Sequence, residues 1–99
     1  GAGMALSKLN SSKPILIMCE EPEDRNLTKV SMRTNERAVE RGIDLQQALS
    51  NASAEYGGGG GGHKIAAGAY IPKTAEEEFI ARVNRILGEQ FAAAGSGHR

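Results

Sequence analysis

Residues 57–71 read GGGGGGHKIAAGAYI, and this stretch decides how the rest of the sequence is understood. Six consecutive glycines usually form a flexible linker between two self-sufficient domains. Here residues 1–56 precede the run and 63–99 follow it, and the second piece is too short for a core of its own. The apolar residues on both sides must therefore pack together, so the glycines lie inside one domain.

Residue periodicity on both sides of the run predicts a mixture of strands and helices. Residues 65–71 are typical of a small-residue strand, and 27–33 alternate as a strand with one buried face does. Helical spacing occurs over 45–56, behind an Asp44 N-cap, and in a second segment that begins near Thr74. The other expected elements are a strand over 14–19 and a short helix over 35–41.

These elements predict an α/β (α+β) fold, in which a small mixed β-sheet of about three to five strands packs with two to four helices. We expect residues 1–91 to form this single domain. Residues 92–99 have no core-forming pattern, so we expect a disordered tail. Gly1 is not a usual protein start, which indicates an excised piece or a tag remnant.

Charge, cysteine content and hydropathy exclude several classes of protein. Twelve Lys and Arg balance twelve Asp and Glu, so a binder that works by bulk positive charge is excluded. The single cysteine, Cys19, excludes a disulfide framework. No apolar run approaches the ~20 residues that span a bilayer, and no signal-peptide pattern occurs. We therefore expect a cytoplasmic protein with no membrane partner.

The glycine run favours an anion site over the known nucleotide-binding loops. The dinucleotide fingerprint runs from strand to helix, whereas here a helix precedes the glycines and a strand follows. A P-loop needs Gly-Lys-Ser/Thr, but Gly62 is followed by His63 and Lys64. The remaining hypothesis is a glycine loop whose backbone N–H groups approach an anion, because glycine leaves no Cβ between backbone and ligand. His63 and Lys64 would contact the same anion.

Residues 60–68, GGGHKIAAG, resemble the Gly-Gly-Gly-His-x-x-Ala-Ala-Gly signature of the DHH-associated C-terminal domain. That domain occurs in the DHH phosphoesterases, which include RecJ-type single-strand exonucleases and the oligoribonuclease/phosphoadenosine-phosphate phosphatases. Residues 30–34, VSMRT, are similar to the family's Val-Ser-x-Arg-Ser strand end, with Thr34 in place of the frequent serine. The resemblance covers about residues 1–90, and the long glycine run is most similar to archaeal RecJ-like members.

The resemblance implies one half of a two-domain enzyme. In that family an N-terminal DHH domain holds two Mn²⁺ ions and hydrolyses a phosphodiester, while the C-terminal domain grips the substrate phosphates. Implied partners are that catalytic domain and single-stranded nucleic acid or a short oligonucleotide. The chain has no Asp-His-His triplet, so we expect it to hold no metal or other cofactor and not to catalyse alone. The candidate substrate- and phosphate-binding residues are Ser31, Arg33, Thr34, Gly60, Gly61, Gly62, His63 and Lys64.

Several alternatives remain open at this point. The chain could be the tRNA-binding C-terminal module related to alanyl-tRNA synthetase, the substrate domain of an oligoribonuclease/phosphoadenosine-phosphate phosphatase, or an interaction module whose glycines only permit tight packing. Arg33 could form a surface ion pair with Glu36 or another acid instead of binding a phosphate, and Lys29 shares its strand face. Tyr70 is expected in the core or at an interface, although it could also stack on a base.

Overall fold

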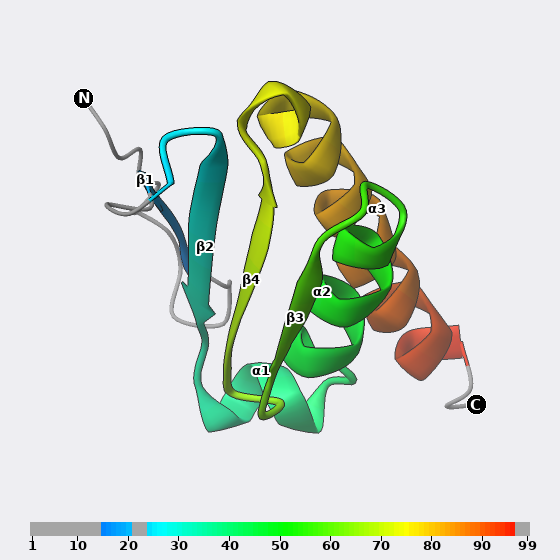
Figure 1. The fold of residues 1–99 in the computed structure, drawn as a ribbon. Coiled ribbons are helices and arrows are strands. Elements are labelled where there is room, and N and C mark those ends of the chain that lie inside the picture. Colours follow the sequence, from blue (N-terminus) through cyan, green and yellow to red (C-terminus); the bar gives the residue numbers. More distant parts are fainter. Residues whose placement is uncertain (1–14, 21–23, 97–99) are drawn as a thin grey trace.

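The computed structural model describes residues 15–20 and 24–96, which form a four-stranded sheet packed against helices (Figure 1). The elements are β1 (Ile15–Glu20), β2 (Leu27–Arg33), α1 (Glu36–Glu40), α2 (Leu45–Ala54), β3 (Gly59–Gly62), β4 (Ala66–Pro72), the 3₁₀ turn η1 (Lys73–Ala75) and α3 (Glu76–Ser96). The strands lie in the order β1-β2-β4-β3. The predicted α/β (α+β) class is confirmed, but all three strand pairings are antiparallel, whereas a mixed sheet was expected.

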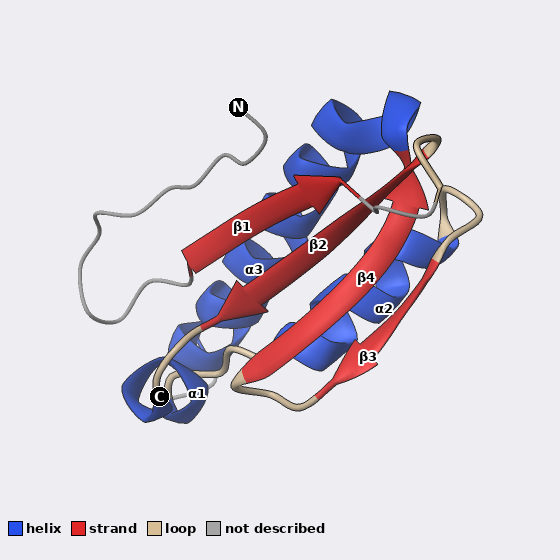
Figure 2. Ribbon diagram, turned by 60° about the vertical axis from the view of Figure 1, so that its left-hand side comes forward, coloured by secondary structure: helices blue, strands red, loops and turns tan. Residues whose placement is uncertain are grey.

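The helices α2 and α3 lie behind one face of the sheet, and no described helix covers the other face (Figure 2). The alternation in β2 explains which face is which, because successive side chains of a strand point to opposite sides. Thr28, Val30 and Met32 are buried, whereas Lys29 and Arg33 are exposed. We call the helix-covered side the core face and the opposite side the open face.

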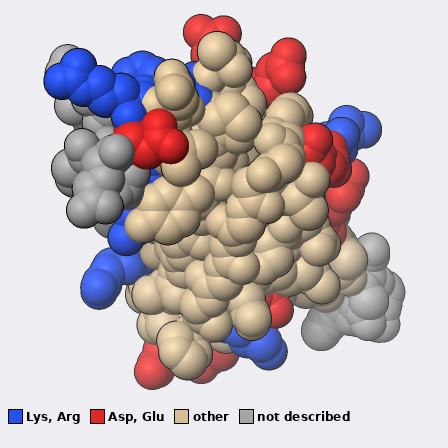
Figure 3. Space-filling model, in the orientation of Figure 1, with Lys and Arg blue, Asp and Glu red and all other residues tan. Residues whose placement is uncertain are grey.

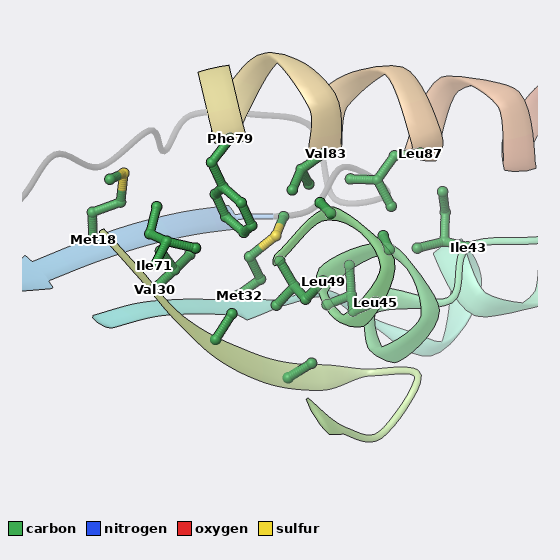
Figure 4. Packing of buried hydrophobic residues seen from close by; sticks show 14 of the residues in the cluster. Met18, Val30, Met32, Ile43, Leu45, Leu49, Ile71, Phe79, Val83 and Leu87 are labelled. Carbon is green, nitrogen blue, oxygen red and sulfur yellow. The ribbon is translucent and has the colours of Figure 1, made fainter. Parts of the chain in front are cut away.

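The core lies between the core face and the two longer helices (Figure 4). Its largest fully buried side chains include Phe79 and Val83 from α3, Leu45 and Leu49 from α2, and Val30 and Ile71 from the sheet. The ring of Tyr56 meets that of Phe79 edge-on, with centroids 6.5 Å apart. The apolar stripe predicted over residues 45–56 is therefore the face of α2 that packs into the core.

Polar contacts fix where α2 begins, next to the glycine strand. The Asp44 carboxylate accepts a hydrogen bond from the Gln47 backbone N–H at 3.0 Å, which is the predicted N-cap. Gln90 of α3 binds the same residue from the other side, since its Oε1 accepts from the Asp44 N–H at 2.8 Å and its Nε2 donates to the Asp44 carbonyl at 3.1 Å. Gly42, with φ of +106°, reverses the chain after α1.

The last helix is longer than the sequence predicts. α3 continues to Ser96, so the tail expected to be disordered from residue 92 is helical for its first five residues. Residues 92–94 are all alanine, the best helix former, and Gln90 just before them is bound to the start of α2. Of the expected domain and tail, residues 1–14, 21–23 and 97–99 lie outside the described part of the chain.

Candidate functional site at the glycine edge strand

Most of the glycine run is a strand rather than the predicted loop. Gly59–Gly62 form β3 at one edge of the sheet and pair along their whole length with β4. Gly57 and Gly58 lie in the connection from α2. Residues without side chains show no alternation, so periodicity cannot predict such a strand. It forms because β4 presents a complementary row of backbone hydrogen-bonding groups.

Alternate glycines of the run are required by the close approach of β4. A Cβ on Gly60 or Gly62 would lie 2.8 or 2.6 Å from a carbonyl oxygen of β4, and one on Gly58 would overlap the carbonyl of Tyr70. In contrast, a Cβ on Gly59 or Gly61 would meet no atom within 4 Å, and neither residue has a positive φ. Close packing against β4 therefore requires glycine at positions 58, 60 and 62. Gly59 and Gly61 face open space, where a side chain would fit.

The pairing directs the amides of Gly60 and Gly62 away from β4. The His63 N–H donates to the Ala66 carbonyl at 2.8 Å, so these two residues form a hydrogen-bonded pair. Bonded and non-bonded pairs alternate in an antiparallel ladder, which places Gly60 and Gly62 in non-bonded pairs. The Gly60 carbonyl also points away from β4, because it accepts a hydrogen bond from the Ser50 hydroxyl of α2 at 3.2 Å. Two backbone N–H groups thus point outward along one sheet edge.

A turn at the end of β3 brings three segments together. Gly62 has φ of +138°, a conformation that residues with side chains rarely adopt, and it starts this turn. The Thr34 N–H donates to the Ile65 carbonyl at 3.0 Å, and the Leu45 N–H donates to the Lys64 carbonyl at 3.1 Å. The turn is therefore held against both the end of β2 and the first residue of α2.

The candidate cations lie around this turn. Arg33 is the last residue of β2 and pairs with Ala66, which in turn is bonded to His63. The backbones of Arg33 and His63 are thus two interstrand spacings apart, or roughly 10 Å. Arg33, His63 and Lys64 are all exposed. Within the described residues Arg33 makes no ion pair with Glu36, the alternative left open by the sequence.

Ser31 and Thr34 add hydroxyl groups in two different surroundings. Ser31 lies opposite Gly68, and Gly68 lies opposite Gly61, so the open face carries no side chain between Ser31 and β3. Thr34 follows β2, and its Oγ1 is buried without a hydrogen-bond partner among the described residues. A buried hydroxyl without a partner is uncommon in folded proteins. The eight predicted site residues accordingly gather where β2 ends and β3 turns into β4.

The open face is cationic although the whole chain has no formal net charge. Strand register assigns to it Ile17, Cys19, Leu27, Lys29, Ser31, Arg33, Gly59, Gly61, Ala66, Gly68, Tyr70 and Pro72. These described members include two cations and no carboxylate. Figure 3 views the molecule from the direction of Figure 1, turned 60° from the view of Figure 2. The middle of the surface seen there shows neither blue nor red atoms, and the charged side chains lie around the margin of the view.

Tyr70 is exposed on the sheet. We expected it either in the core or at an interface, and the expectation of a core position is wrong. Its relative exposure is 40%, and the Lys29 ammonium nitrogen lies 5.6 Å from its ring centroid. Both residues lie on the open face, directly opposite each other on β4 and β2. The signal was present in the sequence, because counting by two from the apolar Ile71 and Ala69 assigns Tyr70 to the opposite side of the strand.

Neither a metal centre nor a membrane-spanning helix occurs in the part of the chain that the structure describes. No group of three or more His, Cys, Asp or Glu side chains there is placed to hold a metal ion. No helix among the same residues has the length and apolar character needed to cross a bilayer.

Two comparisons with known proteins bear on the family. The family model of the DHHA1 domain matches residues 2–89 of the chain. An uncharacterized protein of Methanocaldococcus jannaschii is 40% identical over 89 residues, which make up 90% of this chain and 20% of that protein. The chain thus spans about one fifth of the length of that relative. Because the family model matches nearly the whole chain, the chain belongs to the DHHA1 family of DHH-associated domains.

Proposed function

We propose that this chain is the substrate-binding C-terminal domain of a RecJ-like single-strand exonuclease, and that it grips substrate phosphates at the β3 edge. The observation that carries the proposal is the pair of outward-pointing amides of Gly60 and Gly62, next to the exposed cations of the turn. Membership of the DHHA1 family supports the general role. The RecJ-like assignment rests on the resemblance of residues 30–34 and 60–68.

The chemistry of the edge suits a phosphodiester. Backbone N–H groups on Gly60 and Gly62 donate to phosphate oxygens, and no Cβ on Gly61 hinders their approach. His63 supplies a ring N–H at the same turn. Arg33 can bind a phosphate through two parallel N–H···O bonds, which fixes orientation as well as position. This edge site replaces the looped glycine cradle that the sequence suggested, while it keeps the same residues.

Thr34 offers a further donor, because its hydroxyl has no other partner among the described residues. Its role differs from that of the glycine amides, since the hydroxyl is buried in the free domain. We propose that it orients the end of β2, and with it Arg33, when the substrate binds.

The rest of the enzyme lies outside this chain. The 89 matched residues are 20% of the relative from M. jannaschii, which leaves room for a catalytic domain in that protein. We propose a similar arrangement here, in which an N-terminal DHH domain holds two Mn²⁺ ions and supplies phosphodiester hydrolysis in the cytoplasm. The residues of this chain then bind and orient the substrate but break no bond.

The proposal is tested by titrating the ¹⁵N-labelled chain with nucleoside monophosphates and with short single-stranded DNA. Binding by half of a cleft should be weak, with a Kd on the order of 1 mM for a mononucleotide. Amide shifts are expected at Gly60, Gly62, His63 and Arg33. The affinity for the oligonucleotide should fall with added salt, because each neutralised phosphate releases counterions.

A matched pair of variants separates site contacts from general charge. Arg33→Ala should weaken oligonucleotide binding, whereas Arg85→Ala removes the same charge from the opposite side of the domain and should leave it unchanged. Arg85 is exposed on α3, and its one ion pair among the described residues is with Glu89 of its own helix, with N···O of 3.6 Å. Equal losses in the two variants, or no glycine-edge shifts at millimolar ligand, would refute the proposal. Preference for tRNA over single strands would favour the synthetase-related alternative.

A further inference from the structure

We propose that Tyr70 and Lys29 form a base-stacking site on the open face, for a nucleobase of a single strand whose phosphates lie at the β3 edge. The inference rests on the proposed function, and it adds a contact to the base that the phosphate site lacks. Tyr70 lies on the central strand β4, and no described element covers its ring. Aromatic rings on an open sheet are a common platform for nucleic-acid bases.

The two sides of the Tyr70 ring have different neighbours. On the β2 side, Lys29 lies directly opposite and places its ammonium group over the ring, 5.6 Å from the centroid. On the β3 side the directly opposite residue is Gly59, which has no side chain. A Cβ on Gly59 would meet no atom within 4 Å, so among the described residues nothing fills the place opposite the ring on this side. The site therefore has one cationic side and one side where a planar group can enter.

The path from the phosphate edge to Tyr70 is free of large side chains. Tyr70 lies four residues along β4 from Ala66, or about 13 Å at the usual rise of a strand. The row between them consists of Ser31, Gly68 and Gly61, all small. An extended strand can therefore lie across the face, with phosphates near Arg33 and a base at Tyr70.

The charge of the face favours nucleic acid over a protein partner. The described residues of the open face include Lys29 and Arg33 and no carboxylate, which complements a polyanion. Lys29 can serve the backbone as well as the ring, since it is exposed. Gly61, Gly68 and Ser31 next to Arg33 are small, which leaves room for a nucleic-acid backbone on this face.

The decisive experiment compares intact and abasic oligonucleotides of equal length, using anisotropy of a terminal dye. Tyr70→Ala should weaken binding of the intact strand about fivefold or more, because stacking is worth roughly 1–3 kcal/mol per base. Binding of the abasic strand should be unchanged. Tyr70→Phe keeps the ring and should bind both strands as the unmodified chain does. Circular dichroism verifies that each variant is folded. We expect both to fold because the Tyr70 side chain is exposed.

Tyrosine fluorescence supplies a second readout that does not depend on affinity. The chain has no tryptophan and two tyrosines, so Tyr56→Phe leaves Tyr70 as its only tyrosine fluorophore. Among the described residues the removed hydroxyl donates one long hydrogen bond, to the Glu78 carbonyl at 3.4 Å, so the background change should be small. Saturation with the intact strand should quench Tyr70, and saturation with the abasic strand should not.

The outcomes separate this inference from the function on which it rests. If neither strand binds, both proposals are wrong. If both strands bind and Tyr70→Ala lowers the two affinities equally, the stacking site is wrong while the phosphate site stands. That second result would mean that the ring contributes to binding without stacking on a base. Protection of Tyr70 from acrylamide in the ligand-free chain would also refute the site, since the face would then be occupied.

Discussion

The glycine edge strand makes a sharp prediction about two neighbouring substitutions. Gly60→Ala and Gly61→Ala change the same residue type at adjacent positions of β3. A Cβ on Gly60 would lie 2.8 Å from the Gly68 carbonyl oxygen and 3.0 Å from the Ala69 Cβ. A Cβ on Gly61 would meet nothing within 4 Å. If β3 is paired as described, these two variants should differ strongly in stability.

The magnitude follows from two opposing effects. Both alanines restrict the unfolded chain, which stabilises the fold by about 0.4–1 kcal/mol where the native backbone accepts a side chain. Gly61→Ala should therefore be neutral or slightly more stable than the unmodified chain. Gly60→Ala must also push β3 away from β4, and overpacking of this kind costs about 1–3 kcal/mol. The two variants should thus differ by about 2 kcal/mol, or roughly 8–16 °C in Tm for a domain of this size.

Thermal and urea unfolding followed by circular dichroism measures the difference, and the chain's own far-UV signal suffices. The urea m-value should be the same in both variants, because both expose the same surface on unfolding. Equal stabilities would show that the glycines form a loop away from β4, and the edge-amide argument would then fall with the strand. A destabilised Gly61→Ala would contradict the assignment of that position to open space.

Three further predictions concern the core and the helix contacts, and urea denaturation checks each of them. Phe79→Ala should destabilise the fold by about 3–5 kcal/mol because its ring is fully buried. Phe91 is 51% exposed, so Phe91→Ala should change the stability by less than about 1 kcal/mol. Similar losses in the two variants would contradict the described core. Gln90→Ala should cost about 1–3 kcal/mol because the start of α2 loses two hydrogen bonds at Asp44, and an unchanged stability would contradict that contact. Arg82→Ala should cost less than about 1 kcal/mol, since its ion pair with Glu55 is partly exposed; a larger loss would indicate a second role.

Local patterns in the sequence were sufficient where one residue type determines one structural feature. Asp44 was predicted as an N-cap and accepts the expected backbone hydrogen bond. The alternation over residues 27–33 separated the buried Val30 and Met32 from the exposed Lys29 and Arg33. In these cases the physical cause lies within a few residues of the position concerned, so a short window contains the information.

Features that depend on distant partners were not predictable in the same way. The glycine run becomes a strand because β4 lies beside it, and no periodicity exists in a run without side chains. An ion pair of α3 was not predictable for the same reason. The i,i+4 spacing in the helix favours an ion pair between Arg82 and Glu78. In the structure Arg82 instead pairs at 3.0 Å with Glu55, which lies just beyond the end of α2. The candidate site residues were brought together by strand register, which a single sequence does not display.

The strand that carries the proposed phosphate contacts contributes no side chain to the core, because all its residues are glycine. It is attached to the sheet mainly through backbone hydrogen bonds, and glycine gains more conformational entropy than any other residue when such bonds open. The amide hydrogens of Gly59 and Gly61, which lie in the bonded pairs of the ladder, should therefore exchange through local opening, at a lower free energy than those of the helices that line the core. A ligand that closes this edge would slow exchange there alone. The opening of the β3 edge, which binds the substrate in our proposal, and the unfolding of the core are then two separate equilibria within one small domain.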